Sequence, residues 1–192
     1  TAAYAMVATY DAFALGYAGR TLSLPRSALS STATYAISNL LGFPLFTGNA
    51  VRFWLFESWG RSAGDVAIAS LATTIVCNIA LALIVGLSLI LAPGMVAQVT
   101  GLGAPWGAVI GLALVLASSA LVAAGVAGPR TISLHRFALD RPGPMLALQV
   151  VACALDYFGT AMVLYLPLAE SLGMAFPSFL ALFSIAKLIG IL

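Results

Sequence analysis

The stretch VAIASLATTIVCNIALALIVGLSLILA, residues 66–92, contains no charged side chain and is longer than the roughly 20 apolar residues that a helix needs to cross a bilayer. Three other apolar runs have comparable length: residues 1–19, 106–128 and 145–168. They are too long for membrane strands and lack the alternation of such strands. Within residues 106–128, Gly107 and Gly111 form a G-x-x-x-G pattern that permits close helix packing. We therefore expect an all-α, polytopic bundle of transmembrane helices.

The composition of the whole chain also indicates that the protein lies in a lipid bilayer. Of its 192 residues, 62% are hydrophobic and 7% are charged, whereas a soluble domain carries about 25% charged residues. This balance excludes a disordered chain, and the absence of a Lys/Arg cluster on a soluble face excludes nucleic-acid binding. The chain has one histidine, two cysteines and no P-loop, zinc-protease or nucleophile-elbow motif. We expect no catalytic residue, metal or cofactor in this chain.

The distribution of basic residues predicts an orientation. Basic residues in short connections stay preferentially on the cytoplasmic side of a membrane. The connections at residues 93–105 and 170–176 contain no lysine or arginine, whereas other connections contain Arg20, Arg26, Arg61, Arg130, Arg136 and Arg141. We therefore expect a multi-pass protein whose basic connections face the cytoplasm.

Residues 35–59 do not fit a simple span, because Arg26 precedes them and Arg61 follows them. About 25 residues cannot cross a bilayer twice. We expect a re-entrant pair of half-helices, broken around Gly42-Phe43-Pro44 and Thr47-Gly48-Asn49, where glycine and proline release backbone groups from helical pairing. Broken helices of this kind commonly line the binding sites of transporters. Two tilted short spans or an interfacial helix pair are the alternatives.

Two carboxylates, Asp11 and Asp156, lie midway in predicted spans. A carboxylate there costs a few kcal/mol, so each must face the bundle interior, meet a cation or be protonated. Arg52 and Lys187 are the candidate cations, and the charge count does not say which pairs with which. Each carboxylate could form an ion pair that fixes helix packing, or it could bind a substrate or a proton. Arg52 suits two-point binding of a phosphate, or else reaches back to the interface.

The segment around the expected break resembles a known family. The stretches SNLLG (38–42), LFTGNAVRF (45–53) and WGRSAGD (59–65) are similar to the hallmark region of the bacterial lysylphosphatidylglycerol flippase/synthetase family, also called multiple peptide resistance factor. The stretches LDY (155–157) and VLYLP (163–167) resemble a later helix of the same transmembrane domain. The resemblance extends from about residue 11 to the end. One departure is Trp54, where the family often has a second basic residue.

The resemblance implies a function. Such a protein moves aminoacylated phosphatidylglycerol from the inner to the outer leaflet of the bacterial cytoplasmic membrane, which gives resistance to cationic antimicrobial peptides. Full-length members carry a synthetase domain that nothing here resembles. Because the chain does not begin with methionine and its last apolar run, residues 177–192, is short, we expect residues 1–192 to be a single flippase-like domain of a longer protein.

The expected site binds the headgroup of such a lipid. Arg52 and the backbone amides of Thr47, Gly48 and Asn49 would hold the phosphate, and Asp11 or Asp156 would face the aminoacyl amine. The remaining expected substrate-binding residues are Asn39, Tyr157 and Lys187. Expected partners are the phospholipid, the membrane, a synthetase domain and a second copy of the chain. The alternatives are an intramembrane enzyme, a synthetase-associated scaffolding subunit and an ion-coupled solute transporter.

Overall fold

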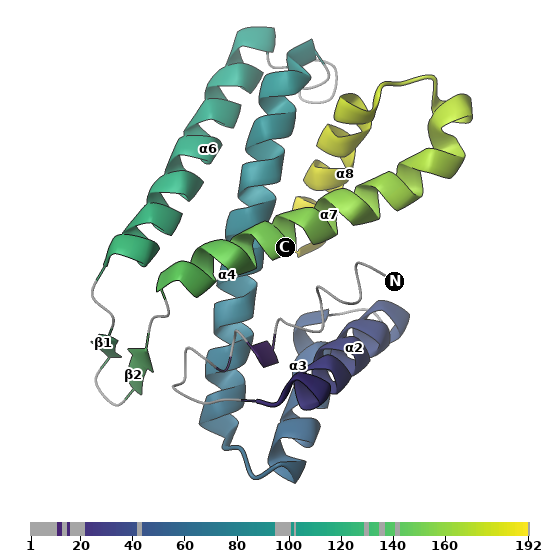
Figure 1. Cartoon of the computed structure of the whole chain (residues 1–192). Helices are drawn as coiled ribbons and strands as arrows, with labels where there is room; N and C mark the ends of the chain where they lie inside the picture. Colours follow the sequence, from purple (N-terminus) through teal and green to yellow (C-terminus); the bar gives the residue numbers. More distant parts are fainter. Residues whose placement is uncertain are drawn as a thin grey trace. The chain divides into compact units, whose positions relative to one another are not determined.

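The computed structural model describes residues 11, 12, 15, 22–41, 44–94, 101, 103–128, 131–134, 137–140 and 143–191. These ranges contain helices α2 (Leu24–Leu41), α3 (Pro44–Ser58), α4 (Ala63–Leu91), α6 (Ala104–Ala127), α7 (Gly143–Leu172) and α8 (Phe176–Ile191) (Figure 1). Between α6 and α7, the short strands β1 (Thr131–Leu134) and β2 (Phe137–Asp140) pair in an antiparallel hairpin. The expected all-α class is confirmed, and the small hairpin occupies what the sequence predicts as a loop.

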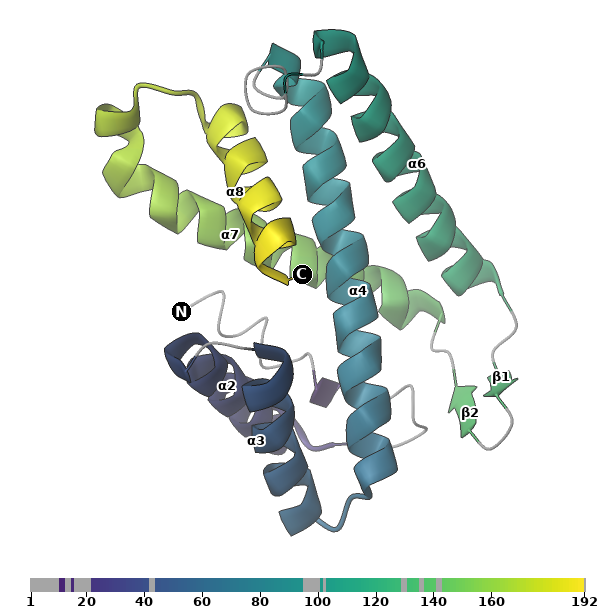
Figure 2. The ribbon, with the colours of Figure 1, turned by 180° about the vertical axis from the view of Figure 1, so that it is seen from behind.

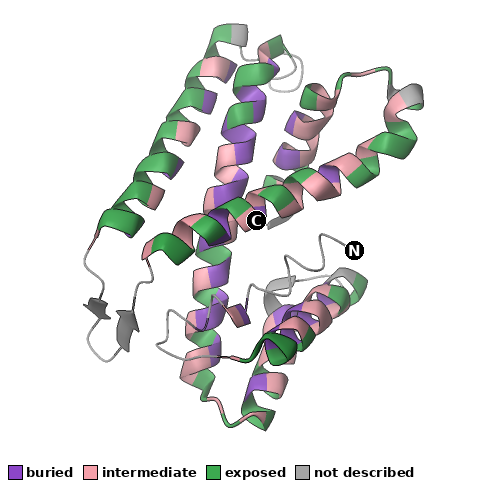
Figure 3. Ribbon diagram, viewed as in Figure 1, coloured by how far each residue is buried: buried purple, intermediate pink, exposed green. Residues whose placement is uncertain are grey.

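Three helices are long and apolar enough to cross a membrane: Ala63–Leu91, Pro105–Ala127 and Gly143–Ala169. They match the predicted spans at residues 66–92, 106–128 and 145–168. The other predicted span, residues 1–19, lies outside the described residues except at positions 11, 12 and 15. Much of α6 is exposed, including Leu112, Leu116 and Leu121 (Figure 3). Apolar helices with exposed leucines suit contact with lipid, and they define a helical membrane protein.

The chain divides into two compact units. Unit 1 comprises residues 1–76 and 125–149, and unit 2 comprises residues 77–124 and 150–192. Helices α4, α6 and α7 each contribute one part to each unit. Each unit is described by itself below.

Unit 2 is built around the second half of α4. There Leu81, Val85 and Leu89 form a buried row, and it packs against Leu114 of α6, Tyr157 of α7 and Ile185 of α8.

Within unit 2, helices α4 and α6 approach each other closely at two glycines, Gly86 of α4 and Gly111 of α6. A Cβ atom added to Gly86 would lie 2.7 Å from the carbonyl oxygen of Gly111, and one added to Gly111 would lie 2.6 Å from that of Gly86. The predicted role of Gly111 in close helix packing is confirmed.

Unit 1 contains a helical hairpin formed by α2 and α3, which lie side by side (Figures 1 and 2). The guanidinium of Arg26, near the start of α2, lies 5.6 Å from the ring centre of Trp59, just beyond α3, so the two ends of the hairpin meet. The chain leaves α2 at Leu41 and enters α3 at Pro44, as the proline predicts. The first helix of the pair begins at Leu24, well before residue 35, because Pro25 is tolerated in a first helical turn.

A tight turn joins α3 to α4. Gly60 has a φ of 72°, and the amides of Gly60 and Arg61 donate to the carbonyls of Glu57 and Phe56, which caps the end of α3. The amide of Ser62 then donates to Asp65, and the amide of Asp65 donates to the Ser62 hydroxyl, at 3.0 and 3.2 Å. This reciprocal capping box starts α4.

Above this turn, Phe56 of α3 packs with Leu15 and with Val66 and Ala69 of α4 in the buried core of unit 1. The turn and this core together fix the position of α3 against α4.

Candidate functional site

The candidate site is centred on a buried ion pair in unit 1. The Nε of Arg52, on α3, donates to Oδ1 of Asp11 at 2.9 Å. The Asp11 side chain is 0% exposed and that of Arg52 is 11% exposed. Removing either partner would leave a charge in an apolar setting, which costs about 3–5 kcal/mol. Of the pairings that the charge count leaves open, the structure selects Asp11 with Arg52.

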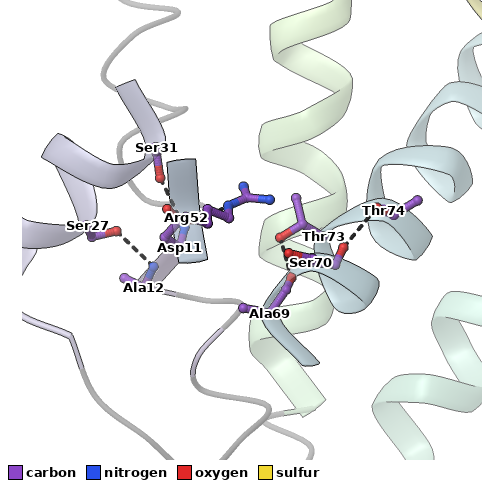
Figure 4. Close-up of polar contacts among 9 residues, drawn as sticks. All are labelled: Asp11, Ala12, Ser27, Ser31, Arg52, Ala69, Ser70, Thr73 and Thr74. Carbon is purple, nitrogen blue, oxygen red and sulfur yellow. Dashed lines mark hydrogen bonds and ion pairs between the residues drawn. The ribbon is translucent and has the colours of Figure 1, made fainter. Parts of the chain in front are cut away.

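A face of buried hydroxyls on α2 lies beside this pair. It consists of Ser27, Ser30, Ser31, Thr34 and Ser38, which recur at helical spacing. The amide of Ala12 donates to the Ser27 hydroxyl at 2.8 Å, and the amide of Asp11 donates to the Ser31 hydroxyl at 3.3 Å (Figure 4). The hydroxyl face of α2 therefore holds the backbone that carries the Asp11 carboxylate.

Helix α4 contributes polar side chains at the same level. Phe56 packs against Val66 and Ala69. Arg52 lies one turn before Phe56 on α3, and on α4 Ser70 lies one turn after Val66 and Thr73 one turn after Ala69. The Thr73 hydroxyl donates to the Ala69 carbonyl at 2.9 Å. Figure 4 shows the guanidinium of Arg52 directed away from the α2 serines.

Several polar atoms near the Arg52–Asp11 pair and on the facing helices have no partner among the described residues. They are Oδ2 of Asp11 and the hydroxyl oxygens of Ser30, Thr34 and Ser70. Within the described part of the chain, the only hydrogen bond of the Arg52 guanidinium runs from Nε, so both terminal nitrogens lack a partner there. We call Asp11, Arg52, Ser30, Thr34 and Ser70 the Arg52 cluster. It offers donors for an anion and one carboxylate oxygen for a cation, in a chain that is otherwise strongly apolar.

The expected nest of free amides at Thr47, Gly48 and Asn49 is wrong, because α3 runs unbroken through these residues. A glycine inside a helix costs only about 1 kcal/mol. Here Gly48 lets α3 approach α2, since an added Cβ would lie 2.7 Å from the Ser38 hydroxyl oxygen. The Thr47 hydroxyl also contacts that oxygen, at 3.5 Å. These residues therefore pack the hairpin, and the side chain of Asn39 lies outside the described residues.

The remaining expected residues lie in unit 2. Lys187 of α8 acts electrostatically on Asp156 of α7, and Oδ1 of Asp156 is buried without a partner among the described residues. The neighbouring Tyr157 packs against the buried row of α4. Of the sequence-predicted residues, the structure thus brings Asp11 to Arg52 in unit 1, and it places Asp156, Tyr157 and Lys187 in unit 2.

The sequence analysis missed the hydroxyl face of α2. Its signal is the spacing of Ser and Thr in SALSSTATYAIS, residues 27–38, which puts hydroxyls at intervals of three and four. Serine and threonine are also typical of loops and helix caps, so their presence alone does not indicate a polar helix face.

No protein-family model matches the chain. Over 98% of its length, the chain is similar to an uncharacterized protein of Synechocystis sp., with 24% identity in 197 aligned residues. The chain spans 59% of the length of that relative.

Proposed function

We propose that this chain is a lipid-translocating domain of a multi-pass protein in the bacterial cytoplasmic membrane. Its proposed substrate is an aminoacylated phosphatidylglycerol, which it moves from the inner to the outer leaflet. The observation that carries the proposal is the Arg52–Asp11 pair, in which the terminal guanidinium nitrogens of Arg52 have no hydrogen-bond partner among the described residues. Arg52 also belongs to the stretch at residues 45–53 that resembles the lysylphosphatidylglycerol flippase family. A synthetase domain and a second copy of the chain remain predicted partners.

The charges of the Arg52 cluster complement such a headgroup. A guanidinium binds a phosphate through two parallel hydrogen bonds, and the Ser70 hydroxyl, which has no partner among the described residues, can donate to a further phosphate oxygen. The unpartnered Oδ2 of Asp11 can accept from the ammonium group of the aminoacyl part. Both interactions gain strength where water is scarce. The acyl chains remain in the surrounding lipid, so this mechanism needs no closed aqueous pore.

Translocation of a cationic lipid has an electrostatic consequence. The negative surface potential of a membrane attracts basic peptides. Lysyl headgroups in the outer leaflet reduce that potential, so we expect cells with an active protein to bind less cationic antimicrobial peptide.

The proposed function is tested with purified protein in vesicles that contain lysylphosphatidylglycerol in both leaflets. A membrane-impermeant amine reagent labels only the outer leaflet in protein-free vesicles. With the protein present, we expect inner-leaflet lipid to become accessible during the reaction, so that nearly all of it is labelled.

Vesicles with phosphatidylethanolamine, which also carries an amine, supply the control. We expect its inner-leaflet pool to stay protected. If neither lipid is exposed, the protein is no translocase of this substrate, and equal exposure of both would contradict selection of the aminoacyl headgroup.

The proposed topology gives a separate prediction. Basic connections are expected in the cytoplasm and the connection at residues 93–105 outside it. Alkaline phosphatase, which is active only outside the cytoplasm, should therefore be active when fused after Gly101 and inactive when fused after residue 136. A fluorescent protein that matures only in the cytoplasm should give the opposite result at both positions. The reverse pattern would invert the proposed orientation of the whole site.

A further inference from the structure

The two cysteines of the chain meet in unit 2. The Sγ of Cys77, on α4, lies 3.1 Å from the Sγ of Cys153, on α7, and the two sulfurs are in contact without a disulfide bond between them. Cys77 lies midway along α4, and Cys153 lies close to the middle of the candidate span Gly143–Ala169. Cys153 is 1% exposed, whereas Cys77 is only partly buried. The pair therefore occupies the apolar level of both helices, and Cys77 is the more accessible of the two residues, whereas Cys153 is enclosed.

This arrangement resembles a reactive thiol with its resolving partner. The accessible thiol is the one that an oxidant can reach, and the enclosed thiol is already in contact with it. At this level of an apolar helix, water and dissolved ions are scarce, so an oxidant must itself be soluble in lipid. We propose that Cys77 and Cys153 are an intramembrane dithiol that a lipid hydroperoxide oxidises to a disulfide.

The reaction balances in two steps. The Cys77 sulfur attacks the terminal oxygen of the hydroperoxide, the O–O bond breaks, and the lipid leaves as an alcohol while Cys77 becomes a sulfenic acid. The Cys153 sulfur then attacks the Cys77 sulfur, forming the S–S bond and releasing water. The thiols lose two hydrogen atoms in total, and the hydroperoxide is reduced to the alcohol and water. A reducing dithiol reverses the change.

The disulfide would have a structural effect within unit 2. It would join α4 to α7 beside the buried row of Leu81, Val85 and Leu89. Sliding or separation of α7 from α4 would then be prevented at this level. The inference does not depend on the proposed function, because it concerns thiol chemistry alone.

The test uses the full chain in lipid vesicles with cumene hydroperoxide as the probe. After oxidation, the protein is denatured and its thiols are labelled with a maleimide that adds a resolvable mass. We expect both thiols to disappear together within one chain, and dithiothreitol to restore them.

Single variants separate this reaction from general oxidation. In C153S, a sulfenic acid should accumulate at Cys77 and react with dimedone. In C77S, the enclosed Cys153 should stay labelled. A thermal unfolding measurement verifies that each variant is folded. Independent loss of the thiols, cross-links between chains, or oxidation only after denaturation would each overturn the proposal.

Discussion

Replacing Arg52 with alanine is expected to reduce translocation of lysylphosphatidylglycerol by about two orders of magnitude. Hydrogen bonds to a charged group contribute about 1.5–3 kcal/mol, and 1.4 kcal/mol corresponds to a factor of ten. The same change leaves the fully buried Asp11 carboxylate without its partner, so the variant should also be less stable. The measurement is the rate at which inner-leaflet lipid becomes accessible to the amine reagent.

A double variant separates binding from stability. In D11N/R52Q, both charges are removed together and two amides of similar size take their places, so no unpaired charge remains. We expect this protein to unfold near the wild-type temperature and still to lack translocation. R26Q is the matched control, because Arg26 is an exposed arginine of the same hairpin, outside the Arg52 cluster. If the double variant transports at the wild-type rate, the pair serves packing only, as in the scaffolding alternative.

The second large effect is expected at the contact of α4 with α6. In G111A, the new methyl group would lie 2.6 Å from the carbonyl oxygen of Gly86, and 3.0 Å from side-chain atoms of Leu89 and Ile90. Because backbone cannot yield as a flexible side chain does, the helices must separate. We expect the free energy of unfolding to fall by about 1–3 kcal/mol, the usual cost of overpacking. Reversible unfolding in detergent micelles measures this change.

Gly159 of α7 is the matched control for this substitution. It is also a helical glycine, but an added Cβ would meet nothing within 4 Å. G159A should therefore leave stability unchanged or raise it by about 0.5–1 kcal/mol, since alanine favours a helix more than glycine does. Equal stability of G111A and G159A would contradict the close approach of α4 and α6.

The long helices could be predicted from the sequence because a bilayer demands a minimum apolar length. Residues 66–92, 106–128 and 145–168 meet that demand, and α4, α6 and α7 occupy nearly the same ranges. The break before Pro44 could also be predicted, since proline lacks the amide hydrogen that continues a helix.

Other features depend on contacts that no local pattern contains. Gly48 is compatible with a broken helix and with a continuous one. The continuous helix α3 is the form in which Gly48 packs closely against Ser38 of α2. The partner of Asp11 is Arg52, far along the chain, and charge counting alone cannot distinguish it from Lys187. Arg52 could be predicted as a candidate from its charge beside an expected helix break, whereas the α2 hydroxyls carry no charge.

The tight turn between α3 and α4, at residues 59–62, restricts how the candidate site around Arg52 can open. Its amides are held by the cap of α3 and by the Ser62–Asp65 exchange, and Phe56 anchors it against α4. We therefore expect helix α3 and the adjoining part of α4 to move as one rigid body, which carries the Arg52 guanidinium with it. Under the proposed function, we therefore expect room for a headgroup to come from movement of α2 rather than of α3.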